Sequence, residues 1–278
     1  MSEWDEWLGR SRKHRCQMDG WRSQALIDSL ELKPLSGDSL PMLWQWIYFL
    51  EAPQRAMQGA DGHPQKGDFF PPIANPRRMF AGGRSILHSP LRLDQPAELV
   101  ETIMRCEEKS GGSGNMTVLT VSYHYHQQGQ LCVEEERDFI YLPARAGEQP
   151  EAVCTDYAEI ASSDWTREVA TDPVLLFKYS ALTFNGHRIH YDRDYARSEE
   201  SYPDLVVHGP MTAILLADLA RRESGSELRR FSFRARAPLY VGDTLRLRGN
   251  PADTDGAIKL AAYRPDGKVA MTAEVEMF

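Results

Sequence analysis

The sequence predicts an α+β fold built from two units, each with a curled antiparallel sheet around one apolar helix. Two observations predict it. Short β-rich runs separated by turn residues occur in both halves of the 278 residues, and each set follows one strongly apolar segment with helical character, at 41–50 and at 206–224. A chain of this length holds one large domain or two of ordinary size.

The first half begins with tryptophans and aliphatic residues at helical spacing, which predict two short helices in the first thirty residues. The run SGDSLPMLWQWIYFL then offers an N-cap and Pro41 in a first turn, so it predicts a buried helix. Glycines and prolines over 59–84 predict an extended loop. From Arg84 four β-rich runs, with GGSGN and QQGQ as turns, predict an antiparallel meander.

The second half repeats this order of elements. Residues 146–170 are polar and weakly periodic, which indicates a linker, and the apolar run 174–183 is interpreted as a strand. The segment 206–224 predicts a strong helix with a Gly-Pro start, and four β-rich runs follow it. We therefore predict a double hot-dog protein with a degenerate unit at 1–145 and a catalytic unit at 171–278. The halves match in element order only.

Composition excludes several classes of function. A net charge of -8 and a pI near 5.5, without a basic stripe, argue against a nucleic-acid partner. The start MSEWDEWLGR lacks the pattern of a signal peptide, and no apolar run approaches the ~20 residues of a membrane span. The expected location is cytoplasmic. The cysteines are widely spaced, which favours reduced thiols over a metal or disulfide; they are Cys16, Cys106, Cys132 and Cys154.

The stretch LTFNGHRIHYDRDYA (182–196) carries the candidate chemistry. Asn185 and His190 lie five steps apart around Gly186, so the backbone can turn both side chains into one pocket, and histidine is the natural general base near neutral pH. At 208–210, HGP opens the apolar helix. The N–H of Gly209 lacks a partner within the helix and can hold a developing oxyanion.

This pairing resembles the MaoC-like hydratase and dehydratase family, whose pattern is D-x-N-P-x-H followed later by a helix that opens with HG. Here N-G-H-R-I-H places Asn185 at the position of the family's aspartate and Arg188 at that of its proline. A subgroup with FNxHRIHYDxxYA has the asparagine. The stretches GADGHP, FFPPIANPRRMFAGG and FSFRARAPLYVGDTL also look like its double hot-dog acyl-CoA hydratases.

The resemblance implies addition of water to a branched dicarboxylic enoyl-CoA, itaconyl-CoA or mesaconyl-C4-CoA, to give citramalyl-CoA. CoA would be part of the substrate, so no separate cofactor is expected. An asparagine cannot take a proton. We therefore expect neutral His190 to deprotonate a water held by Asn185 while Gly209 holds the enolate charge.

Other residues have two interpretations each. Arg188 would suit a substrate carboxylate through a bidentate contact. His187 either binds substrate or orients the loop, and His208 either lines the pocket or satisfies its own backbone. Three further arginines either bind a phosphate or carboxylate or form a solvated face; they are Arg77, Arg78 and Arg84. Asp192 is expected to cap a short helix.

Two other functions remain open at this stage. One is a 3-hydroxyacyl-thioester dehydratase of fatty-acid or polyketide synthesis, although an acidic chain offers little to an acyl-carrier protein. The other is a non-catalytic acyl-CoA-binding hot-dog subunit, against which His190 and HGP argue. We expect the first unit to lend a wall to the site, the loop from GADGHP to FAGG to border the acyl tunnel, and a homodimer to be possible.

Overall fold

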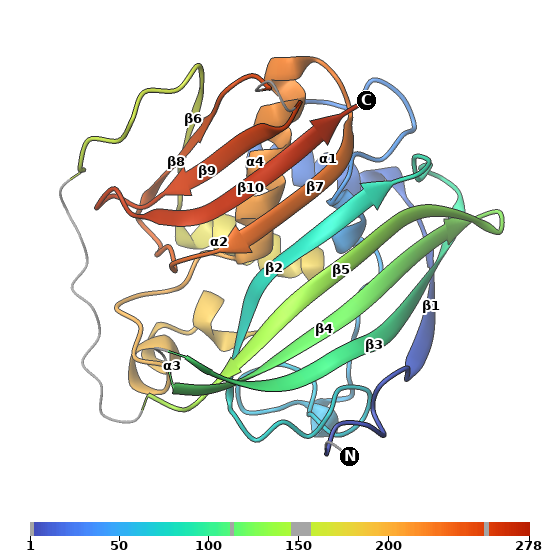
Figure 1. Ribbon diagram of the computed structural model, residues 1–278, viewed down its shortest axis with the longest axis vertical. Helices are drawn as coiled ribbons and strands as arrows, with labels where there is room; N and C mark the ends of the chain where they lie inside the picture. The colour runs from blue at the N-terminus through green and yellow to red at the C-terminus, as the bar shows by residue number, and fades with distance from the viewer. Residues whose placement is uncertain (1–2, 112–113, 146–156, 253–255) are drawn as a thin grey trace.

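The computed structural model describes residues 3–111, 114–145, 157–252 and 256–278. Within them ten strands form one continuous antiparallel sheet, ordered β1-β3-β4-β5-β2-β7-β10-β9-β8-β6 (Figure 1). The strands are β1 (Ser11–Gln17), β2 (Arg77–Leu87), β3 (Pro96–Gly111), β4 (Gly114–Gln127), β5 (Gln130–Leu142), β6 (Trp165–Ala170), β7 (Leu228–Ala235), β8 (Thr244–Gly249), β9 (Ile258–Tyr263) and β10 (Val269–Met277).

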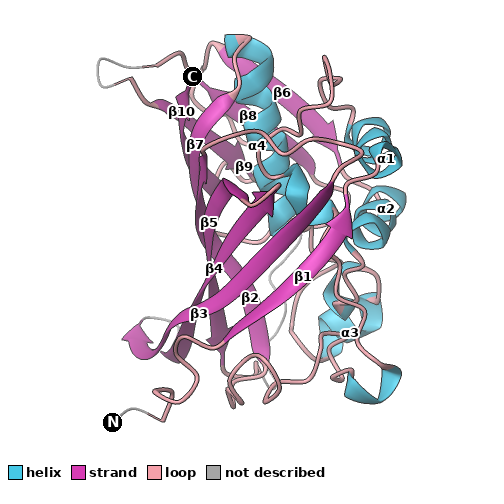
Figure 2. Ribbon diagram, turned by 90° about the vertical axis from the view of Figure 1, so that its right-hand side faces the viewer, coloured by secondary structure: helices cyan, strands magenta, loops and turns pink. Residues whose placement is uncertain are grey.

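The helices lie on one side of this curved sheet (Figure 2). They are α1 (Gly20–Leu30), α2 (Pro173–Thr183), α3 (Arg193–Ser198) and α4 (Gly209–Ser224), with 3-10 turns η1 (Trp44–Ile47), η2 (Arg55–Met57) and η3 (Arg188–His190). Helix α4 contacts β6 to β10, and every residue from Met211 to Arg221 is buried. It is the central helix predicted for the second half, and its burial against the sheet fixes the position of its N-terminus.

The two halves of the sheet join through β2 and β7, where Gly82 pairs with Arg234 and Gly83 with Phe233. A Cβ on Gly82 would lie 2.7 Å from the carbonyl oxygen of Phe233, and one on Gly83 would lie 2.9 Å from that of Glu136. Both distances are too short for a real side chain. The glycine pair of FAGG therefore allows the close approach of strands that makes one sheet from two.

Two element predictions are wrong. The run at 41–50 forms only the four-residue turn η1, because Leu43 adopts a left-handed φ of 75° that interrupts a helix, although the segment is buried as expected. The run at 174–183 is helix α2 and not a strand. Asp172 caps it by accepting a hydrogen bond from the Leu175 N–H, and Pro173 occupies its first turn.

The boundaries also differ from those predicted. The first thirty residues contain strand β1 and helix α1 in place of two helices, and β1 pairs with β3 along its whole length. Strand β2 begins at Arg77, inside the predicted loop 59–84. Strand β6 begins at Trp165 inside the predicted linker, of which 146–156 lie outside the described residues.

Cys16, Cys106 and Cys132 are free thiols, the last two buried, whereas Cys154 lies outside the described residues. In the part of the chain that the structure describes, no helix is long and apolar enough to cross a membrane.

Candidate active site

A cavity of about 1050 Å³ lies where both halves of the chain meet. The first half contributes the end of the GADGHP stretch and strand β2, and the second contributes residues 184–187, part of η3 and the start of α4. Several aromatic rings line its wall; they include Trp46, Phe49, Phe70, Phe80 and Phe139. An apolar cavity with a few polar groups is the usual form of a small-molecule site.

Two loops, one from each half of the chain, pass each other in close backbone contact at Gly62 and Gly186. A Cβ on Gly62, whose φ is +92°, would lie 1.8 Å from the carbonyl oxygen of Gly186, and a Cβ on Gly186 would lie 2.7 Å from that of Gly62. Arg188 stabilises this contact between the loops, because its backbone N–H donates to the Asp61 carbonyl (2.9 Å) and its Nη1 to the Ala60 carbonyl (3.1 Å). Only glycine permits this contact.

His190 presents a bare ring nitrogen to the cavity. Its Nδ1 donates to the carbonyl oxygen of Val206 at 2.7 Å, and because a carbonyl can only accept, Nδ1 carries the hydrogen and Nε2 is unprotonated in the neutral ring. Burial, with His208 and His187 nearby, holds the pKa of His190 well below its usual range. The ring is therefore a neutral base at physiological pH.

The start of α4 lies beside this ring. His208 is the N-cap residue, and its ring stacks on that of His190 with centroids 3.7 Å apart. Its Nε2 shares a hydrogen bond of 2.8 Å with the Ser180 hydroxyl, and burial followed by His187 lowers its pKa to about 3. Gly209 lines the cavity, and no hydrogen bond from its N–H is found within the described residues. His208 itself packs behind His190 and outside the cavity lining.

Asn185 also lines the cavity, but part of its amide is already used. Its Oδ1 accepts the backbone N–H of His187 at 3.0 Å, which fixes the orientation of the amide. The ring of His187 is buried and its Nε2 lies 3.2 Å from Glu200 Oε1, a contact that holds the loop in place. The structure thus brings the predicted residues Asn185, His190 and Gly209 to one cavity, which His187 also lines.

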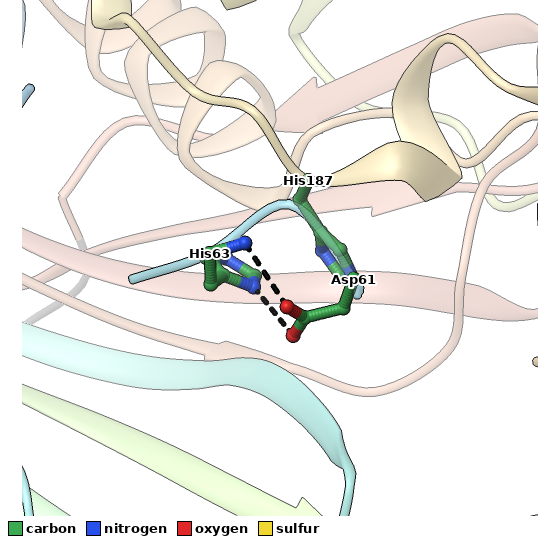
Figure 3. A group of neighbouring side chains, drawn as sticks. All are labelled: Asp61, His63 and His187. Carbon is green, nitrogen blue, oxygen red and sulfur yellow. Dashed lines mark hydrogen bonds and ion pairs between the residues drawn. The ribbon is translucent and has the colours of Figure 1, made fainter. Parts of the chain in front are cut away.

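His63, from the first half of the chain, also lines this cavity. Asp61 accepts the backbone N–H of His63 through Oδ1 and the ring Nδ1–H through Oδ2, both at 3.0 Å (Figure 3). The ring of His63 packs against that of His187 with centroids 4.2 Å apart. Burial alone would raise the pKa of Asp61, but the hydrogen bonds from His63 hold it well below its usual range. Asp61 is therefore ionised.

The four candidate arginines separate into two groups. Arg188 binds Asp192 Oδ2 through Nε (3.0 Å) and Nη2 (2.8 Å), and it lies outside the cavity lining. Arg77 is buried beside Glu200, and Arg84 pairs with acidic side chains of β5; neither lines the cavity. Arg78 alone of the four does, and its guanidinium lies over the rings of Phe139 and Phe70 at 4.3 and 5.3 Å.

Sequence reasoning missed Asp61 and His63 as site residues. The signal was the stretch GADGHP, which contributed to the resemblance but was not assigned a chemical role, because more than a hundred residues separate it from Asn185. Other expectations hold: the loop that begins with GADGHP borders the cavity, and Asp192 caps α3 by accepting the Tyr195 N–H at 3.0 Å.

Comparisons with known proteins point to one family. The profile of hydroxyacyl-thioester dehydratase type 2 matches residues 43–241. The chain is 44% identical over 281 aligned residues to a mesaconyl-C(4)-CoA hydratase of Chloroflexus aurantiacus, an alignment that covers 99% of this chain and 98% of the relative.

Solved structures agree on the fold. A MaoC-like dehydratase superposes with a TM-score of 0.73 at 13% identity and covers 98% of both chains. A conserved hypothetical protein of Mycobacterium tuberculosis with a double hotdog fold superposes with a TM-score of 0.59 at 12% identity, over 98% of this chain and 96% of the other. These similarities confirm the hot-dog fold predicted from the order of elements.

Proposed function

Because the chain belongs to the hydroxyacyl-thioester dehydratase type 2 family, within the MaoC-like double hot-dog dehydratases, we propose that it adds water reversibly to a branched dicarboxylic enoyl-CoA. Hydration or dehydration of an acyl thioester follows from the family. The single observation that supports the site is the unprotonated Nε2 of buried His190, which shares a cavity with the N–H of Gly209 at a helix start.

The mechanism follows from these groups. His190 takes a proton from a water in the cavity as the oxygen attacks the β-carbon of the conjugated thioester. The electron pair of the double bond moves to the thioester oxygen, where the Gly209 N–H and the positive end of α4 stabilise the charge. The proton on His190 then passes to the α-carbon. Each group supplies a factor of roughly 10² or more, so each lowers the barrier by a few kcal/mol.

Arg78 supports a substrate with a free carboxylate. In the described part of the chain its guanidinium has no hydrogen bond or ion pair, only the two aromatic faces. Two other cavity arginines are compensated: Arg137 binds Glu135 through two nitrogens and Arg12 binds Glu51. A partly buried guanidinium without a counter-ion needs an anion to stabilise it, and its flat face against Phe139 leaves its donors for a bidentate carboxylate.

The relative's printed substrate fits this arrangement. In a mesaconyl-C4 thioester the free carboxylate is attached to the β-carbon, the atom that water attacks, so the residue that binds it must lie close to the catalytic histidines. Arg78 lowers the pKa of His63 through its charge, which places it near this part of the cavity. We therefore assign the carboxylate contact to Arg78, in place of Arg188.

A panel of enoyl-CoA thioesters with and without a free carboxylate tests the proposal through loss of the conjugated thioester absorbance. The wild type should hydrate the branched dicarboxylic thioesters, and His190→Ala should lower kcat by at least ~10²-fold. His88→Ala is the control, because the His88 side chain is half exposed and, among the described residues, its ring pairs only with Glu134. Turnover confined to straight-chain monocarboxylic substrates, or a His190→Ala enzyme with nearly normal kcat, would refute it.

Arg78→Met tests the carboxylate contact separately. We expect KM for the dicarboxylic substrate to rise by one to two orders of magnitude, with little change for a monocarboxylic one, since a charge-assisted bidentate contact contributes about 1.5–3 kcal/mol. An equal effect on both substrates would mean that Arg78 only packs against its aromatic neighbours.

A further inference from the structure

His63 presents the same chemistry to the cavity as His190. Its Nδ1–H is held by the Asp61 carboxylate, so in the neutral ring Nε2 carries the lone pair. Among the described residues the ring makes its hydrogen bond through Nδ1 and none through Nε2, it lines the cavity, and the side chain is 19% exposed. The rings of His63 and His190 are both close to that of His187, at centroid distances of 4.2 and 5.5 Å from it.

An attacking water needs two acceptors. One of its hydrogens is removed by the general base, and the other remains on the oxygen in the product. If both hydrogens are held by acceptors, a lone pair of the oxygen is left to point at the β-carbon. His190 Nε2 is one acceptor. Asn185 is a poor second, because its Oδ1 already accepts the His187 N–H and its other group can only donate.

We propose that His63 is a further catalytic residue whose Nε2 accepts the second hydrogen of the attacking water, and that Asp61 is a positioning residue that fixes its tautomer. The inference rests on the proposed hydratase function. The O–H bond toward His190 breaks as the C–O bond forms at the β-carbon, and that proton goes on to the α-carbon. The O–H bond toward His63 stays intact and becomes the hydroxyl of the product, so no other reactant is consumed.

The surroundings of His63 keep it in the form that accepts. Burial, the charge of His187 and that of Arg78 lower its pKa to about 3, against the opposing effect of Asp61. At neutral pH the ring therefore has a free Nε2, while the ionised Asp61 below it prevents the other tautomer. The same negative charge would stabilise any positive charge that develops on the ring while the water reacts.

Asp61, His63 and His187 are close enough together to hold a metal ion, since one donor atom from each lies within 4.8 Å of the others. Their hydrogen bonds favour the other interpretation. Both oxygens of Asp61 bind N–H groups of His63, and His187 Nε2 contacts Glu200. An ion would have to displace these contacts, so the experiment includes a metal arm.

Two substitutions at His63 separate a catalytic role from a structural one. Asparagine keeps a donor near the position of Nδ1 and so keeps the bond to Asp61, but it removes the atom that faces the water. Glutamine places an amide oxygen near the position of Nε2 but gives up the bond to Asp61. We expect His63→Asn to lower kcat at least ~10²-fold with KM and unfolding midpoint nearly unchanged, and His63→Gln to stay within about tenfold of wild type.

The matched control is the same pair of substitutions at His88, which should leave kcat unchanged. Asp61→Asn provides a second reading: it should lower kcat and alter its pH profile, because the tautomer of His63 is no longer fixed. If His63→Asn fails to fold, Asp61→Asn and His63→Gln decide the matter through the same pH profile.

The inference is overturned if His63→Asn keeps kcat within about threefold of wild type. It is also overturned if both His63 variants lose activity equally together with a lower unfolding midpoint, or if EDTA inactivates the wild type and Zn²⁺ restores it. These failures differ from failure of the proposed function, in which the wild type itself hydrates no enoyl-CoA of the panel. An active wild type, an inactive His190→Ala and an active His63→Asn would remove only the present inference.

Discussion

Replacing Gly62 with alanine should inactivate the enzyme while leaving most of its stability. The new Cβ would lie 1.8 Å from the Gly186 carbonyl oxygen and 2.7 Å from its carbonyl carbon, whereas real Cβ contacts below 3.0 Å are essentially never found. The two loops must therefore separate by about 1 Å. A displacement of that size in a catalytic constellation costs on the order of 10²-fold in rate, or about 2.7 kcal/mol of transition-state stabilisation.

The backbone of Gly62 adds a separate penalty, because its φ of +92° lies outside the region that alanine prefers. This penalty is roughly 1–2 kcal/mol of folding stability. Gly129→Ala is the matched control: Gly129 has a φ of +77°, lies in the turn between β4 and β5, and has no atom within 4 Å of a built Cβ. It should lose similar backbone stability and no activity.

The assay is kcat on the preferred enoyl-CoA together with urea unfolding of both variants. Gly62→Ala should lose about two orders of magnitude in kcat, and Gly129→Ala less than a factor of two. If the two variants have the same kcat, the crossing of Gly62 and Gly186 does not position the histidines, and the geometric argument for the site is wrong.

Arg188→Met should lower kcat on dicarboxylic and monocarboxylic substrates alike, because Arg188 holds the loop of Ala60 by a hydrogen bond and does not line the cavity. A rise in KM for dicarboxylic substrates alone would instead identify Arg188 as the carboxylate ligand. Asn185→Asp should keep kcat within about tenfold of wild type and move the acidic limb of its pH profile to higher pH, since a carboxylate favours the charged form of His190. An acidic limb at the same pH would mean that residue 185 does not interact with His190. The free energy of unfolding should fall as pH drops below about 6.5, by up to ~1.4 kcal/mol per pH unit for each buried histidine. The reason is that His190 and His208 have lowered pKa values in the fold, so the unfolded chain binds more protons in this pH range. Urea midpoints from pH 7 to 5 measure this slope, and His208→Gln should reduce it.

The strand pattern predicted most of the sheet, because alternation and turn residues are local signals. β3, β4, β5 and the last four strands lie where those signals place them. The apolar segments were harder to interpret, since periodicity cannot distinguish a short buried helix from a buried strand. In α2 the buried residues Leu176, Tyr179 and Ser180 follow helical spacing, but the exposed face includes Val174 and Phe177, which conceals the period.

The candidate site divides in the same way. His190, Asn185 and Gly209 could be proposed from sequence because one short segment and one helix start carry them. Asp61 and His63 could not be paired with them, because their meeting depends on the join between β2 and β7 and on the crossing of two glycines from different halves. Neither contact leaves a periodic signal. Arg78 and Arg77 are neighbours in sequence, and only the pleat of β2 decides which one lines the cavity.

The first half of the chain contributes more than a wall to this arrangement. It supplies His63 and Arg78, and the second half supplies His190 and Gly209, so neither half contains a complete set of polar groups. The GADGHP loop crosses to the other half, and its Gly62 and Asp61 contact the segment that carries His190. The proposed site therefore depends on how closely the two halves pack, because their contact at Gly62 and Gly186 leaves no room for a single methyl group.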